Sequence, residues 1–390
     1  MRRILYVEFT ADGSVGGSHH SLLHVLRRLD PVRYRPLIAF YQDNPLVPEF
    51  RELTSEIVFL QRPSRAPGHR PLLLRRADYL VRGLAAPAWR AARLLRSRAV
   101  DLVHLNNSVV HGEEWMLAAR LAGTRCVVHQ RGYGYGRESN RLLARWADVV
   151  ICCSDDVRRD LASLGVEPRE GLVTVHDGLD PVELRSRVSG SPRGVREDFG
   201  VAETAPLVGM VGNIKEWKGQ HILVEALALL APRHPGLRCL IVGQVARIDE
   251  DGAFAARLAE RIRSAGLEAT VTLTGYRPDV PRIMNALDVV VHASIDPEPF
   301  GMVVVEAMAL GKAVIATDHG GPREILAHGE SGLLVPPGDP TALAGALDGL
   351  LRDPARRERL GAAARHRVEE RFDVGRLAGR IEEIYGRLLG

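Results

Sequence analysis

The sequence predicts an α/β protein with two doubly wound parallel sheets, each in its own domain. The chain has 390 residues, which is enough for two hydrophobic cores. Short apolar runs rich in β-branched residues alternate with amphipathic stretches, and such runs are typical of parallel strands covered on both faces. The runs form two series with a polar segment between them. Each series therefore predicts one Rossmann-like domain.

Each apolar run is expected to form one strand. The predicted strands of the first half are 4–9, 36–40, 57–60, 101–105, 125–129, 149–153 and 172–176. Those of the second half are 206–211, 238–242, 270–273, 289–292 and 313–317. Helical periodicity fills the gaps, for example at 18–29, 220–230 and 254–265.

The domain boundary is predicted from composition. Residues 186–200 are rich in Ser, Gly, Pro and Arg, which is typical of a linker. We therefore expect an N-terminal domain at 1–187 and a C-terminal domain at 188–371. The last segment, 372–390, is predicted to be an amphipathic helix. Parallel sheets bind ligands at the carboxyl ends of their strands, so a ligand cleft is expected between the domains.

The composition excludes several classes of protein. Hydrophobic residues make up 46% of the chain and charged residues 26%, which is ordinary for a folded globular protein. No apolar run approaches the roughly 18 residues that span a bilayer. The apolar stretch after Met1 is too short for a signal peptide. These features indicate a cytoplasmic protein.

The cysteines fit the same picture. Cys126, Cys152, Cys153 and Cys239 all lie in apolar runs that resemble strands. Cys152 and Cys153 are adjacent and would point to opposite faces of a strand, so no cysteine has metal-ligand spacing. Four buried, inert thiols are expected.

Positive charge is concentrated in one segment. Residues 62–98 contain ten arginines and one acid, Asp78. Arg90, Arg93 and Arg96 fall near one helical face with apolar residues behind them. One interpretation is peripheral contact with an anionic membrane at its inner face; the other is a solvated helix packed on the sheet. Nucleic-acid binding is disfavoured, because no reader module is present.

The segment that is most informative about a binding site follows the predicted strand 289–292. A Pro-rich loop carries Glu298, and the helix expected from Met302 carries Glu306, eight positions later. Backbone amides around Phe300–Met302 would lie at the N-terminus of this helix, which favours an anion such as a diphosphate. A carboxylate one turn into the helix can accept both hydroxyls of a ribose. The alternative is an ordinary strand-loop-helix with two solvated glutamates.

A second loop, 212–219, follows the first strand of the second domain. The chain has only three lysines, Lys215, Lys218 and Lys312, and two of them lie in this loop. An ammonium group there could bind phosphate. The Gly-Lys-Ser/Thr order of a Walker loop is missing, and with three lysines chance remains an alternative.

Together these loops resemble glycosyltransferase family 4, over essentially the whole chain. The Glu-x7-Glu motif of the family matches Glu298 and Glu306, within the longer match from Glu298 to Gly311. The resemblance implies a GT-B fold and a retaining transfer from a nucleotide-diphosphate sugar without a metal. It also implies that the domain at 1–187 binds the acceptor, that the domain at 188–371 binds the donor, and that the helix at 372–390 packs back on the first domain. It places Glu298 against the donor sugar and Glu306 on the ribose. The amides of Phe300, Gly301 and Met302 would cradle the sugar and the phosphate.

The sequence departs from the family at one position of the loop that is expected to bind the diphosphate. Gly212, Lys218 and Gly219 match the Gly-Arg…Lys-Gly loop of the family, but Asn213 stands where the family has arginine. Lys215 or Arg131 could supply the missing charge. Another segment that borders the base in this family matches Tyr276 and Arg277, which are weaker donor-binding candidates.

The first domain offers further candidates by resemblance. Gly16 and Gly17 match a glycine pair near the donor phosphates. His129 ends a predicted strand, as does a family histidine near the donor sugar, with His104 as its competitor. Acceptor-side candidates from the following loop are Arg131, Tyr133 and Tyr135. The turn 176–180, in which Asp177 replaces the usual Asn, is interpreted as structural.

The sequence thus predicts a glycosyltransferase that acts on a carbohydrate, lipid-linked or small-molecule acceptor. His129 and Glu298 are the predicted catalytic residues, and their role is to position the sugar rather than to act as nucleophiles. No metal is expected, because the Asp-x-Asp at 249–251 has no diphosphate signal beside it. The alternatives are a phosphorylase, hydrolase or epimerase on the same scaffold, or a non-catalytic nucleotide-sugar binding protein.

Overall fold

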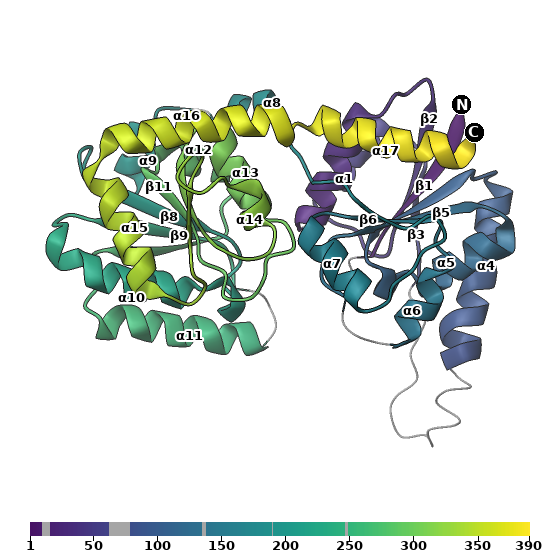
Figure 1. Ribbon diagram of the computed structural model, residues 1–390, viewed down its shortest axis with the longest axis horizontal. Coiled ribbons are helices and arrows are strands. Elements are labelled where there is room, and N and C mark those ends of the chain that lie inside the picture. Colours follow the sequence, from purple (N-terminus) through teal and green to yellow (C-terminus); the bar gives the residue numbers. More distant parts are fainter. Residues whose placement is uncertain (10–15, 62–78, 135–137, 189, 246–248) are drawn as a thin grey trace, which may run out of the picture. The chain divides into compact units, whose positions relative to one another are not determined.

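The computed structural model describes the chain except for residues 10–15, 62–78, 135–137, 189 and 246–248 (Figure 1). It divides into two compact units. Unit 1 comprises Met1–Gly178 and Val374–Gly390, and unit 2 comprises Leu179–Asp373. Each unit is built on a parallel sheet, so the predicted α/β fold with two doubly wound sheets is confirmed. None of the described helices is long and apolar enough to cross a membrane.

Unit 1 contains a seven-stranded parallel sheet in the order β3-β2-β1-β4-β5-β6-β7. Its strands are β1 (Arg2–Glu8), β2 (Tyr34–Phe40), β3 (Ile57–Phe59), β4 (Leu102–Asn107), β5 (Arg125–Gln130), β6 (Val149–Cys152) and β7 (Leu172–Thr174). Strands β1 to β3 extend to one side of β1, whereas β4 returns to its other side. The direction of winding therefore reverses between β1 and β4, which is where such sheets bind ligands.

Helices connect these strands and cover the sheet of unit 1 (Figure 1). They are α1 (Gly17–Arg28), α2 (Val47–Leu53), the π-helix η1 (Tyr79–Ala85), α4 (Ala86–Ser97), the 3-10 turn η2 (Val109–His111), α5 (Glu113–Ala122), α6 (Glu138–Ala144), α7 (Asp155–Ser163) and α17 (Val374–Leu389). The cysteines of both units are free and buried, as predicted.

Unit 2 contains a six-stranded parallel sheet in the order β10-β9-β8-β11-β12-β13. Its strands are β8 (Leu207–Val211), β9 (Arg238–Val242), β10 (Val271–Gly275), β11 (Val289–His292), β12 (Ala313–Thr317) and β13 (Leu333–Val335). Here the winding reverses between β8 and β11. The loops that follow these two strands are the predicted donor-binding loops, 212–219 and 293–301.

Helices lie on both faces of this second sheet (Figure 1). They are α8 (Pro181–Ser186), α9 (Pro192–Asp198), η3 (Glu216–Lys218), α10 (Gln220–Leu230), η4 (Ala231–Arg233), α11 (Asp249–Ser264), α12 (Val280–Ala286), α13 (Met302–Ala309), α14 (Pro322–Ile325), α15 (Pro340–Arg352) and α16 (Pro354–Arg371). Helices α10, α11 and α15 share one apolar core with the strands.

Two features differ from the sequence prediction. Strand β13 was not predicted, because its apolar run is limited to Leu333–Val335 between Gly332 and Pro336, whereas the runs of the equally short β3 and β7 extend over 57–60 and 172–176. The predicted linker 186–200 is wrong in its centre, where α9 forms. The Ser191 hydroxyl caps this helix by accepting a hydrogen bond from the Gly194 amide, and Pro192 pre-sets its first turn. Arg196 then binds the Asp288 carboxylate at 2.9 Å, which attaches α9 to the body of unit 2.

The final helix, α17, completes the core of unit 1. Leu377, Ile381 and Leu388 are buried against side chains from α1 and β1. Tyr385 lies among them, and its hydroxyl donates to the Tyr6 hydroxyl at 3.1 Å. The same hydroxyl lies 2.6 Å from Nδ1 of His104. Burial lowers the pKa of His104 to about 3, so this imidazole is neutral. The last helix is thereby hydrogen-bonded to both β1 and β4 at the centre of the sheet.

We expect Tyr385→Phe to destabilise unit 1 by about 1–3 kcal/mol, because the buried Tyr6 hydroxyl and His104 ring each lose a hydrogen-bond partner. Urea unfolding followed by tryptophan fluorescence and circular dichroism measures the change. Tyr34→Phe is the matched control, since the Tyr34 hydroxyl makes only a 3.4 Å contact with the Glu382 carbonyl. Equal effects of the two substitutions would contradict the role given to the Tyr385 hydroxyl.

Candidate functional site

The loop after β8 lies against the end of β11. Gly219 adopts φ +77°, and a Cβ there would lie 1.9 Å from the Ala293 carbonyl oxygen. The Ile295 amide donates to the Trp217 carbonyl at 2.8 Å, which ties the two loops together. Only glycine permits this close approach. The result is that Lys218 and Glu298, 80 residues apart in sequence, are neighbours.

Glu298 is held by three partners. Its Oε2 lies 2.5 Å from Lys218 Nζ, and 3.3 Å from both His292 Nε2 and Ser294 Oγ. Burial alone would raise the pKa of the Glu298 carboxyl, but the Lys218 ammonium and His292 outweigh it and hold this pKa at about 2. Glu298 is therefore ionised at neutral pH and is a weak proton acceptor. His292, the last residue of β11, and Ser294, two residues beyond it, were not predicted.

The start of α13 is shaped to expose backbone amides. Gly301 precedes the helix with φ +107°, a left-handed conformation that favours glycine. Gly321 packs so closely that a Cβ there would meet the Phe300 carbonyl oxygen at 2.1 Å, and the Gly321 amide donates to the Glu298 carbonyl at 2.8 Å. The first amides of a helix have no partner within it. The amides that begin at Met302 can therefore bind an anion next to Glu298.

Glu306 lies within α13 and is partly buried. Desolvation raises the pKa of its carboxyl to about 7, although the charge of Arg187 opposes the shift. At neutral pH this carboxyl is thus divided between its two protonation states. A carboxylate in such a position gains most from hydroxyl donors supplied by a ligand.

The three other side chains predicted to bind the donor are Asn213, Tyr276 and Arg277. Asn213 is exposed, and its carbonyl accepts a hydrogen bond from Gln220 at 2.9 Å. The Arg277 guanidinium binds both oxygens of Asp279, each at 2.8 Å, and lowers the pKa of that carboxyl. Tyr276 is 69% exposed.

In unit 1, a buried polar cluster lies at the ends of β1, β4 and β5. Asn106 donates to the Glu8 carboxylate at 2.5 Å, and its own oxygen accepts from Arg131 Nε at 2.9 Å. Arg131 also binds Asp177 through Nη1 and contacts His129 Nδ1 through Nη2 at 3.2 Å. The cluster surrounds the switch point between β1 and β4. Sequence reasoning missed Glu8 and Asn106, for which the end of a central strand was the available signal.

Arg131 is therefore engaged inside unit 1. Its side chain is 7% exposed, as is that of Asp177. All three guanidinium nitrogens contact protein acceptors. The charge of Arg131 is therefore directed to partners within unit 1.

The remaining candidates of unit 1 lie on two loops. Gly16 and Gly17 begin α1, and a Cβ at either position would meet no atom within 4 Å. The Tyr133 hydroxyl donates to Asp156 at 2.7 Å, and burial with this carboxylate raises the pKa of the tyrosine. Tyr135 lies outside the described residues.

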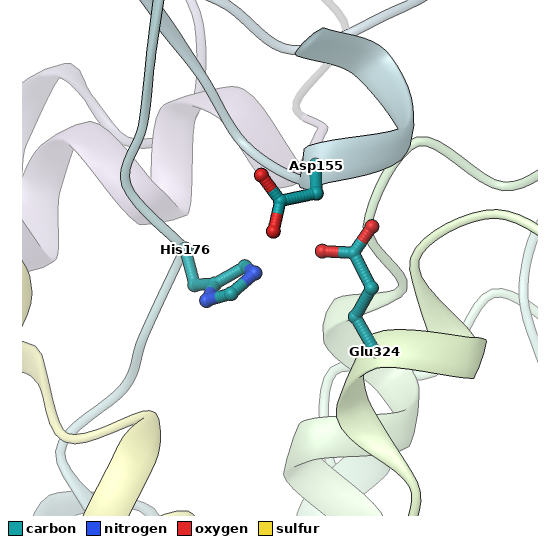
Figure 2. A group of neighbouring side chains, drawn as sticks. All are labelled: Asp155, His176 and Glu324. Atoms are coloured by element: carbon teal, nitrogen blue, oxygen red, sulfur yellow. The ribbon is translucent and has the colours of Figure 1, made fainter. Parts of the chain in front are cut away.

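Two side chains near the end of β7 also face each other. Figure 2 shows Asp155 at the start of α7 and His176 in the turn 176–180, with their polar atoms pointing toward one another. Hydrogen bonds from Thr174 and Arg158 lower the pKa of the Asp155 carboxyl. Glu324, also labelled in Figure 2, belongs to α14 of unit 2. Within unit 1, Asp155 thus has internal partners that account for its ionisation.

Comparison with known proteins identifies the family. The model of Glycosyltransferase Family 4 matches residues 15–183, and that of Glycosyl transferases group 1 matches residues 194–367. The 2-deoxystreptamine glucosyltransferase of Streptomyces kanamyceticus is 30% identical over 378 residues, which cover 89% of this chain and 92% of the relative. The chain belongs to glycosyltransferase family 4. It is an enzyme, a glycosyltransferase.

Other family relatives agree. Alpha-maltose-1-phosphate synthase of Mycolicibacterium smegmatis is 30% identical over 323 residues, covering 74% of this glycosyltransferase and 82% of that enzyme. The crystal structure of HepE from Anabaena in complex with UDP-glucose is 26% identical, with a TM-score of 0.83, and covers 99% of this chain and 100% of that one. The predicted GT-B fold is thereby confirmed.

Ionisation of Glu306 is expected to cost stability. Because its pKa is raised to about 7 in the folded state, the folded protein binds the proton more tightly than the unfolded chain. Stability is therefore lost as pH rises from about 4.5 to 7, by up to about 3 kcal/mol. Glu306→Gln should remove this loss. The free energy of unfolding of the variant should therefore increase relative to that of the wild type as pH rises. Urea unfolding at a series of pH values measures the difference.

Glu298→Gln is a control whose stability relative to the wild type should change with pH in the opposite direction. The pKa of Glu298 is lowered to about 2, so ionisation of this residue contributes stability above the unfolded-state pKa, and that stability is lost as pH falls toward 2. The variant should be less stable than the wild type at pH 7 and approach it in acid. Parallel pH profiles for both glutamine variants would show that the two environments do not differ as described.

Proposed function

We propose that this glycosyltransferase moves a sugar from a nucleotide-diphosphate sugar to a carbohydrate, lipid-linked or small-molecule acceptor, with retention of anomeric configuration and without a divalent metal. The observation that carries the proposal is the pairing of Lys218 with Glu298 beside the N-terminus of α13. One cation, one anion and a set of backbone amides stand together at the switch point of the unit 2 sheet. These are the groups that a negatively charged diphosphate and a sugar with several hydroxyls require.

The proposed donor contacts follow from this geometry. The Lys218 ammonium has three N–H donors, so it can keep Glu298 and still bind a phosphate oxygen. The amides at Gly301 and Met302 add dipoles directed at the same anion. Glu306 accepts the ribose hydroxyls and becomes fully ionised when they bind. Charge that develops on the leaving diphosphate is thus met by groups already in place, which is the basis for expecting no metal.

Retention without a protein nucleophile is part of the proposal. Glu298 is bound to Lys218, His292 and Ser294 and has a pKa of about 2. Such a carboxylate orients sugar hydroxyls but is poorly suited to take a proton. In the proposed reaction the acceptor hydroxyl attacks from the face of the leaving phosphate, which takes its proton. The anomeric configuration of the product, read by NMR, tests this step.

Relatives suggest where to begin the search for a donor. The S. kanamyceticus relative is named as a glucosyltransferase, and HepE was crystallised with UDP-glucose. Donors based on UDP and glucose are therefore the first choice. A non-catalytic binding protein remains the second candidate, because Asn213 lacks the positive charge that the family has at this position.

We expect one nucleoside diphosphate among UDP, GDP, ADP, CDP and dTDP to raise the melting temperature of the wild type without metal, since a ligand that binds the native state stabilises it. Lys218→Ala removes a charge-assisted contact and should weaken binding about tenfold or more. Glu306→Ala should weaken it through loss of the ribose contact. Thermal-shift titrations with and without magnesium measure these effects, and Arg263→Ala is the control, because this exposed arginine pairs with Glu260 of its own helix α11.

The outcomes separate the candidate functions. If no diphosphate stabilises the wild type under either condition, the proposed donor site is wrong. If one binds but the donor sugar stays intact after long incubation with many acceptors, the protein is a binding protein. Transfer that requires magnesium would refute the proposed metal independence.

The basic segment supports a proposed peripheral contact with anionic membranes. Residues 62–78 lie outside the described residues, but 79–98 contain five arginines and no acid. Leu80 and Val81 of η1 and Trp89 of α4 are 56%, 61% and 56% exposed. The Arg93 guanidinium lies 4.9 Å from the Trp89 ring centroid. Exposed apolar side chains together with arginines are typical of a helix that lies on a charged bilayer.

Vesicle co-sedimentation tests this contact. We expect binding to vesicles of phosphatidylcholine and phosphatidylglycerol in equal parts, and none to phosphatidylcholine alone. Arg90→Glu with Arg93→Glu should lower the partition coefficient at least tenfold, since each arginine contributes about 1 kcal/mol near an anionic surface. The same charge change at Arg257 and Arg261 of α11 should have little effect. Equal loss from both pairs would indicate non-specific attraction only.

A further inference from the structure

The hydrogen bonds around His129 determine which of its ring nitrogens carries the proton. Arg131 Nη2 lies 3.2 Å from His129 Nδ1. A guanidinium has donors and no acceptor, and it stays charged in proteins. Nδ1 must therefore accept, which leaves it without a proton. The proton of the neutral ring then resides on Nε2.

The other ring nitrogen is buried without a protein acceptor. His129 is 0% exposed, and among the described residues its Nε2 has no hydrogen-bond partner. The neighbouring ring, His104, has its centroid 5.5 Å away, and no hydrogen bond joins the two rings in the part of the chain described. A buried N–H without an acceptor is costly, by about 1–3 kcal/mol. Such a group is well suited to an oxygen that a ligand brings.

Asp177 keeps the guanidinium in place. Its carboxylate binds Arg131 Nη1 and accepts a hydrogen bond from the Ser21 hydroxyl at 2.6 Å. Asn106 accepts from Arg131 Nε, so the guanidinium plane is fixed by contacts on three sides. Protonating His129 would place a second cation against Arg131 in a buried site. Burial first, and then the charge of Arg131, accordingly lower the pKa of His129 well below its usual value.

We propose that Arg131, anchored by Asp177, is a positioning residue that holds His129 as the Nε2–H tautomer. The ring then donates a hydrogen bond to an oxygen of the bound sugar and does not take the proton of the acceptor hydroxyl. The inference rests on the proposed function in assigning a sugar to this site. Arg131 itself needs no contact with the sugar, and the turn that carries Asp177 acquires a role beyond structure.

The test is the protonation of His129 in the full-length protein without substrate. Long-range 1H–15N correlation spectra of protein labelled with 15N-histidine distinguish a protonated ring nitrogen from an unprotonated one. His129→Asn assigns the signal by removing it. In the wild type we expect a proton on Nε2 and none on Nδ1. A proton on Nδ1, or on both nitrogens, overturns the proposal, and this measurement requires no variant of the cluster.

Two variants test the role of the ion pair. Arg131→Met with Asp177→Asn removes both charges together, which avoids leaving one buried charge unpaired. We expect the second tautomer of His129 to become populated, and kcat to fall about ten- to a hundredfold with a smaller change in the KM of the acceptor. Asp177→Asn alone keeps Arg131 as donor and should keep the wild-type tautomer.

The readouts separate the possible failures. If the double variant keeps the Nε2–H tautomer, or loses only thermal stability, Arg131 is structural and the proposal is wrong. If the wild type shows the expected tautomer but transfers no sugar from any donor, the proposed function fails while the assignment of the proton stands.

Discussion

The ion pair between Lys218 and Glu298 is the interaction on which the candidate site of unit 2 depends. A carboxylate that is 14% exposed remains charged only if nearby groups replace its lost hydration. Lys218 can reach it because Gly219 has no side chain to collide with Ala293. The loop of Glu298 is in turn held by Gly321. The site is therefore assembled from loops after β8, β11 and β12, which the order of strands brings to one edge of the sheet.

Sequence reasoning predicted what depends on local pattern. Apolar runs marked twelve of the thirteen strands, and the glutamate spacing marked the loop and helix of the candidate donor site. The error at α9 arose because Ser-Pro-Arg-Gly composition was weighed above the capping signal of Ser191 and Pro192. Contacts across long separations were not predictable, such as Tyr385 with Tyr6, 379 residues apart, or Asn106 with Glu8. No feature of one residue in such a pair specifies its partner.

The sheets of the two units reverse their winding in the same way, but the charged groups at the two switch points differ. In unit 2, a lysine with spare donors and a row of helix amides favour an anion. In unit 1, the positive charge of Arg131 is matched by Asp177 and buried, and the Glu8 carboxylate at the switch point is bound by the Asn106 amide. Under the proposed function, the groups that would meet the charge of the leaving diphosphate belong to unit 2.

Burial raises the pKa of the Glu306 carboxyl to about 7, so the folded protein disfavours the ionised form of this residue. Evolution toward stability alone would replace it with an apolar side chain of similar size. Its presence on the same helix whose amides face the Glu298 loop is explained if a ligand supplies hydrogen-bond donors to its ionised form. Two hydroxyls of a ribose would do so, and the cost in the free protein would then become selectivity for a nucleotide.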